Sequence, residues 1–98
     1  MPDIIKYVIM TGRVQGVGYR YWTESCARRL GLKGWVRNRK DGTVEAVFAG
    51  PADAVSAMIA DCRHGPSSAQ VASLVERTAN EDELKINGGQ TFVSLPTV

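Results

Sequence analysis

Apolar and polar residues alternate over two stretches of the chain, residues 5–10 and 70–77. A period of two is typical of a β-strand with a buried face, so both stretches are predicted to be strands. Residues 34–38 and 43–49 are two further apolar runs, and they flank Asp41-Gly42. This dipeptide favours the positive backbone angles of a tight turn, which predicts that the two runs form an antiparallel hairpin.

Helical spacing separates these strands. Apolar side chains recur every three or four positions over residues 19–30, and Gly31 follows as a C-terminal cap residue would. A second amphipathic pattern begins after Gly50-Pro51 and ends at His64-Gly65-Pro66. The sequence therefore predicts one helix after the first strand and another after the third.

The order of these elements is βαββαβ, and it predicts an α+β fold for residues 1–98 as a single domain. It is the ferredoxin-like arrangement, a sandwich in which an antiparallel sheet carries two helices on one face. The polar run Asn80-Glu81-Asp82-Glu83 is expected to be a loop, and residues 90–95 are expected to add a C-terminal edge strand before Pro96. The pairing of that strand stays open.

Composition and charge limit the classes of molecule that the protein is expected to bind. The net charge of +2 is spread over the 98 residues, which is too weak a basic balance for a dedicated nucleic-acid binder and favours small anions. Two cysteines, Cys26 and Cys62, make no disulfide framework, although a single bond between them stays open. No targeting segment or membrane-spanning run is evident, so we expect a cytoplasmic protein that binds no membrane.

The segment Gly12-Arg13-Val14-Gln15-Gly16-Val17-Gly18-Tyr19-Arg20 joins the first strand to the first helix. Its glycines allow successive backbone N–H groups to point at one centre, next to the positive end of a helix. Arg20 in the first helical turn offers a planar fork of donors to phosphate oxygens. The spacing matches neither a Walker loop nor a dinucleotide fingerprint, so the segment predicts a phosphate site without a nucleotide. The alternative is a flexible connection.

Three motifs, GRVQGVGYR, GWVRN and DGTVE, resemble those of the acylphosphatases, small hydrolases of carboxyl-phosphate anhydrides. The resemblance implies that Arg20 and the loop amides bind the phosphoryl group, that the Asn38 side chain orients the attacking water, and that Thr43 helps to shape the site. The loop positions concerned are Gln15, Gly16, Val17, Gly18 and Tyr19. We also expect a small acyl phosphate as the substrate, inhibition by the product phosphate, and no need for a cofactor or a metal. A monomer is expected, although the sequence leaves the oligomeric state open.

Two other classes of function stay open. An RNA-binding module on the same scaffold would use Arg37, Arg39 and Lys40 as basic contacts and Trp35 or Tyr7 for stacking. Against it, the third strand has only one aromatic residue. A non-catalytic anion-binding or maturation domain would keep the loop, but would not need an Asn to orient water. A cysteine nucleophile is excluded, because no Arg stands six positions after either cysteine.

Overall fold

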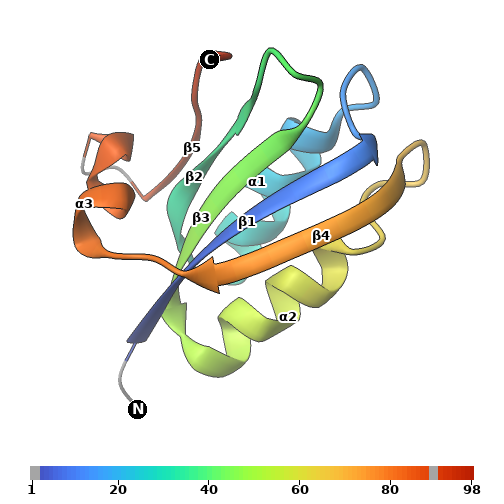
Figure 1. Cartoon of the computed structure of the whole chain (residues 1–98). Coiled ribbons are helices and arrows are strands. Elements are labelled where there is room, and N and C mark those ends of the chain that lie inside the picture. The colour runs from blue at the N-terminus through green and yellow to red at the C-terminus, as the bar shows by residue number, and fades with distance from the viewer. Residues whose placement is uncertain (1–2, 89–90) are drawn as a thin grey trace.

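The computed structural model describes residues 3–88 and 91–98, and its strands form one five-stranded sheet (Figure 1). The strand order is β4-β1-β3-β2-β5. The pairs β4–β1, β1–β3 and β3–β2 are antiparallel, whereas β5 runs parallel to β2. The strands are β1 (Asp3–Arg13), β2 (Lys33–Asn38), β3 (Val44–Pro51), β4 (Gln70–Thr78) and β5 (Phe92–Ser94).

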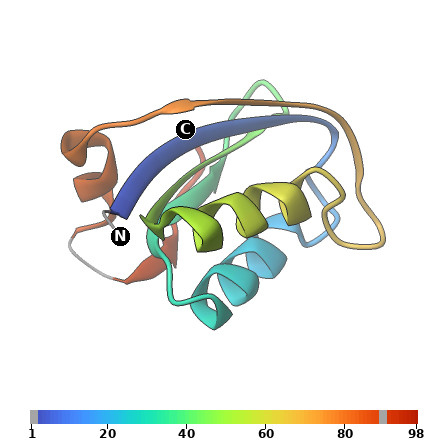
Figure 2. The same ribbon diagram turned by 90° about the horizontal axis from the view of Figure 1, so that it is seen from below.

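Two helices, α1 (Tyr19–Arg29) and α2 (Ala52–Cys62), lie side by side against one face of the sheet (Figure 2). Leu30 caps α1, and Gly31 beyond it adopts the left-handed conformation expected of a helix stop (φ 71°). The βαββαβ order, both long helices and the hairpin at Asp41-Gly42 are confirmed. No helix in the described part of the chain is long and apolar enough to cross a bilayer.

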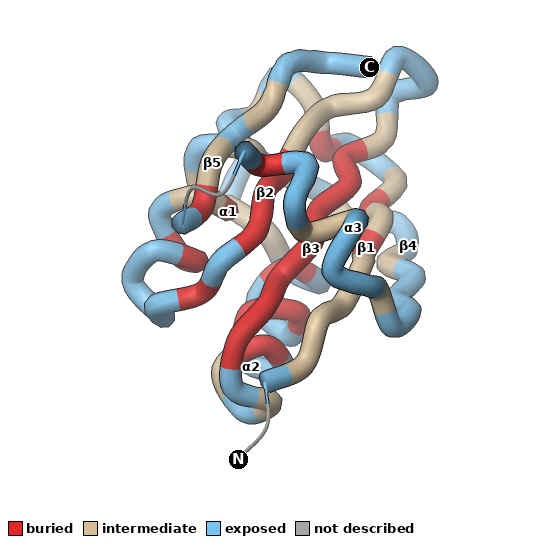
Figure 3. Tube along the Cα trace, turned by 90° about the vertical axis from the view of Figure 1, so that its left-hand side faces the viewer, coloured by how far each residue is buried: buried red, intermediate tan, exposed pale blue. Residues whose placement is uncertain are grey.

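The core lies between the sheet and these two helices. Val8 and Met10 of β1 point into it, so the alternating pattern of that strand does bury one face. The central strand β3 is buried from Val44 to Gly50 (Figure 3), because it has a strand on either side and elements on both faces. Phe48 stacks on Phe92 with 5.6 Å between ring centroids, which fixes β5 to the core.

The expectation of a loop at residues 80–83 is wrong. Asn80 caps a one-turn helix, α3 (Glu81–Leu84), in a reciprocal capping box with Glu83, and a 3₁₀ turn, η1 (Lys85–Asn87), follows. The Trp35 indole donates to the Glu83 carbonyl at 2.8 Å. This contact holds α3 against the sheet face opposite α1 and α2.

The expected extra edge strand is confirmed as β5, while Gln90, where the predicted strand begins, lies outside the described residues. The parallel pairing of β5 with β2 makes the sheet mixed at this edge. Ser94 thereby reaches the end of the sheet at which α1 begins.

Candidate active site

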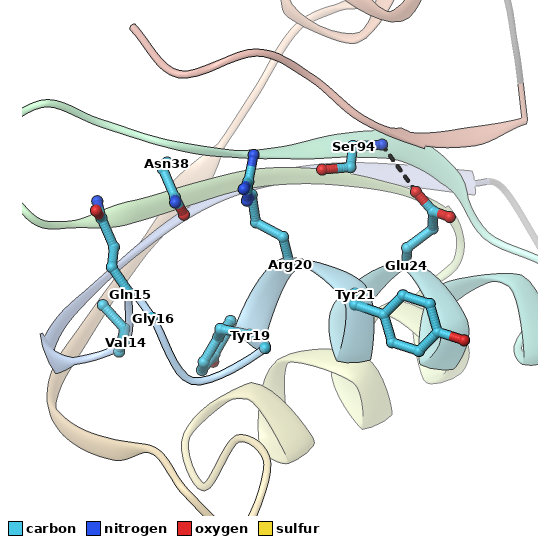
Figure 4. Close-up of a pocket in the computed structure, with 10 residues that line it drawn as sticks. Val14, Gln15, Gly16, Tyr19, Arg20, Tyr21, Glu24, Asn38 and Ser94 are labelled. Carbon is cyan, nitrogen blue, oxygen red and sulfur yellow. Dashed lines mark hydrogen bonds between the residues drawn. The ribbon is translucent and has the colours of Figure 1, made fainter.

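A cavity of about 340 Å³ opens where the β1–α1 loop and the first turns of α1 meet the ends of β2 and β5 (Figure 4). It takes side chains from segments that are far apart in the sequence. The residues that line it are Val14, Gln15, Gly16, Gly18, Tyr19, Arg20, Tyr21, Glu24, Asn38 and Ser94.

The glycines of the loop give the cavity free backbone donors. Gly16 and Gly18 both adopt the left-handed conformation, with φ of 72° and 79°. An added Cβ at either position would meet no atom within 4 Å, so the backbone angle and not crowding requires glycine there. Gly18 is also the N-cap of α1 and has no side chain to cap the helix.

The backbone N–H groups of residues 15–21 donate to no acceptor within residues 3–88 and 91–98. Those at the start of α1 carry the positive end of the helix dipole. Together they are the kind of anion site that the sequence predicts.

Arg20 and Asn38 face this site from opposite walls. Arg20 rises from the first turn of α1, and the Asn38 side chain points toward the same space from the end of β2 (Figure 4). Both residues are half-buried, and neither side chain is hydrogen-bonded or ion-paired to any described residue. The structure thus brings together the two residues on which the predicted chemistry depends.

Gln15 also lines the cavity, but its side chain is engaged elsewhere. Its Nε2 donates to the carbonyls of Arg39 at 2.7 Å and Thr43 at 2.9 Å. Both carbonyls belong to the β2–β3 turn. Gln15 therefore ties the phosphate loop to the hairpin that carries Asn38.

Thr43 does not line the cavity. Its hydroxyl donates to the Asp41 carboxylate at 2.6 Å and its backbone N–H to the same oxygen at 3.0 Å, and these hydrogen bonds lower the pKa of Asp41. Val17 also lies outside the lining and packs against the core. The connection of Thr43 to the site runs through its carbonyl and Gln15.

Four lining residues were absent from the sequence prediction: Val14, Tyr21, Glu24 and Ser94. Glu24 could have been found, because it stands four positions after Arg20 and so shares its helix face. No local sequence pattern predicts Ser94 as a lining residue, because its place in the cavity depends on the pairing of β5 with β2.

The cysteines lie away from the cavity, buried on facing helices as free thiols. Burial raises the pKa of the Cys62 thiol to about 12, so it is protonated at neutral pH.

The Tyr19 hydroxyl donates to the Cys62 carbonyl at 2.5 Å and anchors the ring of Tyr19 beneath the loop. In the described part of the chain, no three His, Cys, Asp or Glu residues are grouped so that they could hold a metal ion.

Comparison with known proteins identifies the family. The acylphosphatase family model matches residues 6–92, which include the loop, Arg20 and Asn38. The chain belongs to the acylphosphatase family. It is 54% identical to acylphosphatases of Nitrobacter hamburgensis and Rhodopseudomonas palustris, over the full length of each pair.

Solved structures agree. An acylphosphatase from Coxiella burnetii superimposes with a TM-score of 0.84 at 29% identity, covering 95% of this chain and 93% of that one. An acylphosphatase from Bacillus subtilis superimposes with a TM-score of 0.81 at 31% identity, and the alignment covers 94% of this chain and 99% of that one. The protein is accordingly an enzyme that hydrolyses the carboxyl-phosphate anhydride of acyl phosphates.

Proposed function

We propose that Arg20 and the amides of residues 15–20 bind the phosphoryl group of an acyl phosphate, while the Asn38 side-chain amide orients the attacking water. One observation carries this assignment. The cavity is walled by free helix-terminal amides, a guanidinium and a carboxamide, and none of these groups has a partner among the described residues. Gln15 contributes its backbone amide, and its side chain fixes the loop to the hairpin. Thr43 supports the site through that same contact.

The reaction needs little more than these donors. The water oxygen forms a bond to phosphorus as the bond from phosphorus to the acyl oxygen breaks, and the electron pair of that bond leaves on the carboxylate. A carboxylate is a stable anion at neutral pH, so no general acid has to protonate it. The proton of the water passes to a phosphoryl oxygen of the substrate. Arg20 and the amides stabilise the negative charge on the equatorial oxygens.

Several wider properties belong to the same proposal. Residues 1–98 form a single acylphosphatase domain that acts as a monomer in the cytoplasm, without metal or cofactor, and binds inorganic phosphate as an inhibitory product. The net charge of +2 supports a small anionic substrate and argues against a nucleic-acid partner. Two free, buried cysteines are compatible with a reducing compartment.

The test is phosphate release from benzoyl phosphate by the purified protein and by an Asn38→Ala variant, each with and without a strong chelator. We expect the chelator to have no effect and the substitution to lower kcat by about 10²-fold or more, the usual loss for a positioned polar group. Inorganic phosphate should still bind to Asn38→Ala, because the amide is assigned to water and not to the anion. Equal losses of phosphate affinity and rate would assign Asn38 to the phosphate site instead, and inactivation by the chelator would contradict metal-free chemistry.

A further inference from the structure

The cavity continues past Arg20 into a region that the proposed mechanism does not use. Tyr21, Glu24 and Ser94 line this part, on the other side of Arg20 from Gln15 and Asn38 (Figure 4). The Glu24 carboxylate accepts a hydrogen bond from the Ser94 backbone N–H at 3.0 Å, which joins α1 to β5. The cavity therefore has two ends, one at Asn38 and one at the Glu24–Ser94 contact.

The chain geometry accounts for this separation. On the helix wall, Glu24 lies about one turn after Arg20 on the same face. On the sheet wall, Ser94 pairs with Val36, two positions before Asn38 in β2. Each wall thus leads away from the water-orienting end, and Arg20 stands between the two ends.

The geometry of in-line displacement indicates which part of the substrate lies at the Glu24–Ser94 end of the cavity. The attacking and leaving oxygens lie on opposite sides of the transferred phosphoryl group. If Asn38 holds the water on one side, the acyl oxygen departs on the opposite side, toward Tyr21 and Glu24. We propose that Tyr21, Glu24 and Ser94 form the subsite for the acyl group, and that Glu24 makes it selective for acyl groups without a second negative charge. This inference rests on the roles proposed for Arg20 and Asn38.

The charge of Glu24 is the basis of the selectivity. Its side chain is 26% exposed, and its Oε1 is ion-paired to Nη2 of Arg28 at 3.6 Å. The guanidinium of Arg28 donates to the Phe92 carbonyl at 3.1 and 3.2 Å and does not line the cavity. An acyl group in the subsite would therefore meet the carboxylate and not its counter-ion.

Tyr21 supplies the apolar surface. Tyr21 is 82% exposed although it lines the cavity, so its ring is free to cover an acyl group. Aromatic or short aliphatic acyl phosphates fit such a surface. An acyl group that bears a carboxylate or a second phosphate is disfavoured by Glu24.

The experiment compares three substrates that share the phosphoryl group: benzoyl phosphate, 4-carboxybenzoyl phosphate and 4-(trimethylammonio)benzoyl phosphate. The kcat/KM of each charged substrate is divided by that of benzoyl phosphate, and the ratio in the variant is divided by the wild-type ratio, so that intrinsic reactivity cancels. In Glu24→Gln we expect the ratio for the carboxylate substrate to rise about fivefold and the ratio for the cationic one to fall. The side-chain amide oxygen that this substitution introduces can still accept from the Ser94 N–H. Glu81→Gln, on the opposite face of the sheet, is the matched loss of one negative charge and should change neither ratio.

The outcomes separate the two proposals. If the ratios in Glu24→Gln equal those in Glu81→Gln while Asn38→Ala has lost its rate, the acyl subsite is wrong and the mechanism stands. If Asn38→Ala keeps the wild-type rate, the proposed mechanism is wrong, and the in-line argument for the subsite fails with it.

Tyr21→Ala tests the role of the aromatic ring in the acyl subsite. KM for benzoyl phosphate should rise more than KM for acetyl phosphate, and an equal change in both would contradict the role of the ring.

Discussion

Some of the polar side chains around the cavity already have partners within the protein. Gln15 donates to two carbonyls and Glu24 accepts from Ser94, so both are oriented before any ligand arrives. Arg20 and Asn38 differ, since neither side chain has a partner in the described part of the chain. Half-buried polar groups usually find a partner, and those left free at a cavity are the groups that a ligand satisfies.

Arg20→Lys tests whether charge alone is enough. A guanidinium can reach two phosphoryl oxygens at once with a fixed planar fork, whereas an ammonium is a strongly hydrated point charge. We expect kcat/KM for benzoyl phosphate to fall by about 10²-fold or more, nearly as far as in Arg20→Ala.

Arg13→Lys is the matched control for this substitution. Arg13 is exposed at the end of β1 and does not line the cavity, so its variant should keep kcat/KM close to the wild-type value at equal ionic strength. Near-wild-type activity in Arg20→Lys would show that Arg20 does not act as a bidentate clamp.

At the scale of elements, the long periodic patterns, the Asp41-Gly42 hairpin and the C-terminal strand are predicted correctly from the sequence, whereas the one-turn helix α3 is not. α1 is predicted to end within one residue of its observed end, because apolar spacing and Gly31 both mark it. α3 is missed because four residues cannot display a helical period, although Asn80 and Glu83 carry the spacing of a capping box. Glu24 and Ser94 are missed for a related reason. Their places in the site follow from how α1 and β5 pack together, which local patterns do not encode.

Asn80→Ala tests the contribution of α3. Loss of the cap leaves the Glu83 N–H without its acceptor and frees the end of the element that covers Trp35. We expect the free energy of unfolding to fall by about 1 kcal/mol, measured by urea denaturation, with kcat/KM unchanged because α3 lies on the face away from the cavity.

Ser56→Ala serves as the comparison for Asn80→Ala. Ser56 is exposed on α2 and makes no cap, so its loss should alter the free energy of unfolding by less than about 0.5 kcal/mol. A change in kcat/KM in Asn80→Ala at unchanged stability would mean that α3 influences the site directly.

For the whole molecule, the free energy of unfolding should fall at alkaline pH. Burial raises the pKa of Cys62 from 9.0 to about 12. Burial, and then the contact with Glu45, raises the pKa of Tyr7 from 10.0 to about 12. The folded state holds both protons more tightly than the unfolded state does. The stabilisation is therefore complete below about pH 9 and is lost progressively as the pH rises toward 12.

Urea denaturation at pH 7, 9, 10 and 11 should give a free energy of unfolding that falls above pH 9. Cys62→Ser removes one of the two groups and should make the decline shallower. A free energy of unfolding that stays constant or rises over this range would contradict the assignment of these groups as buried and protonated.

The contact between Glu24 and Ser94 also has a kinetic consequence. It joins residues 70 positions apart, and β5 can dock only where β2 is already in place. A topology rich in contacts between residues so far apart in the sequence folds slowly. In a refolding experiment, α1 can form early from local contacts, but the far end of the cavity is complete only when the last strand has joined the sheet. Recovery of hydrolysis therefore reports the final step of folding, and it should lag behind the recovery of helical circular dichroism.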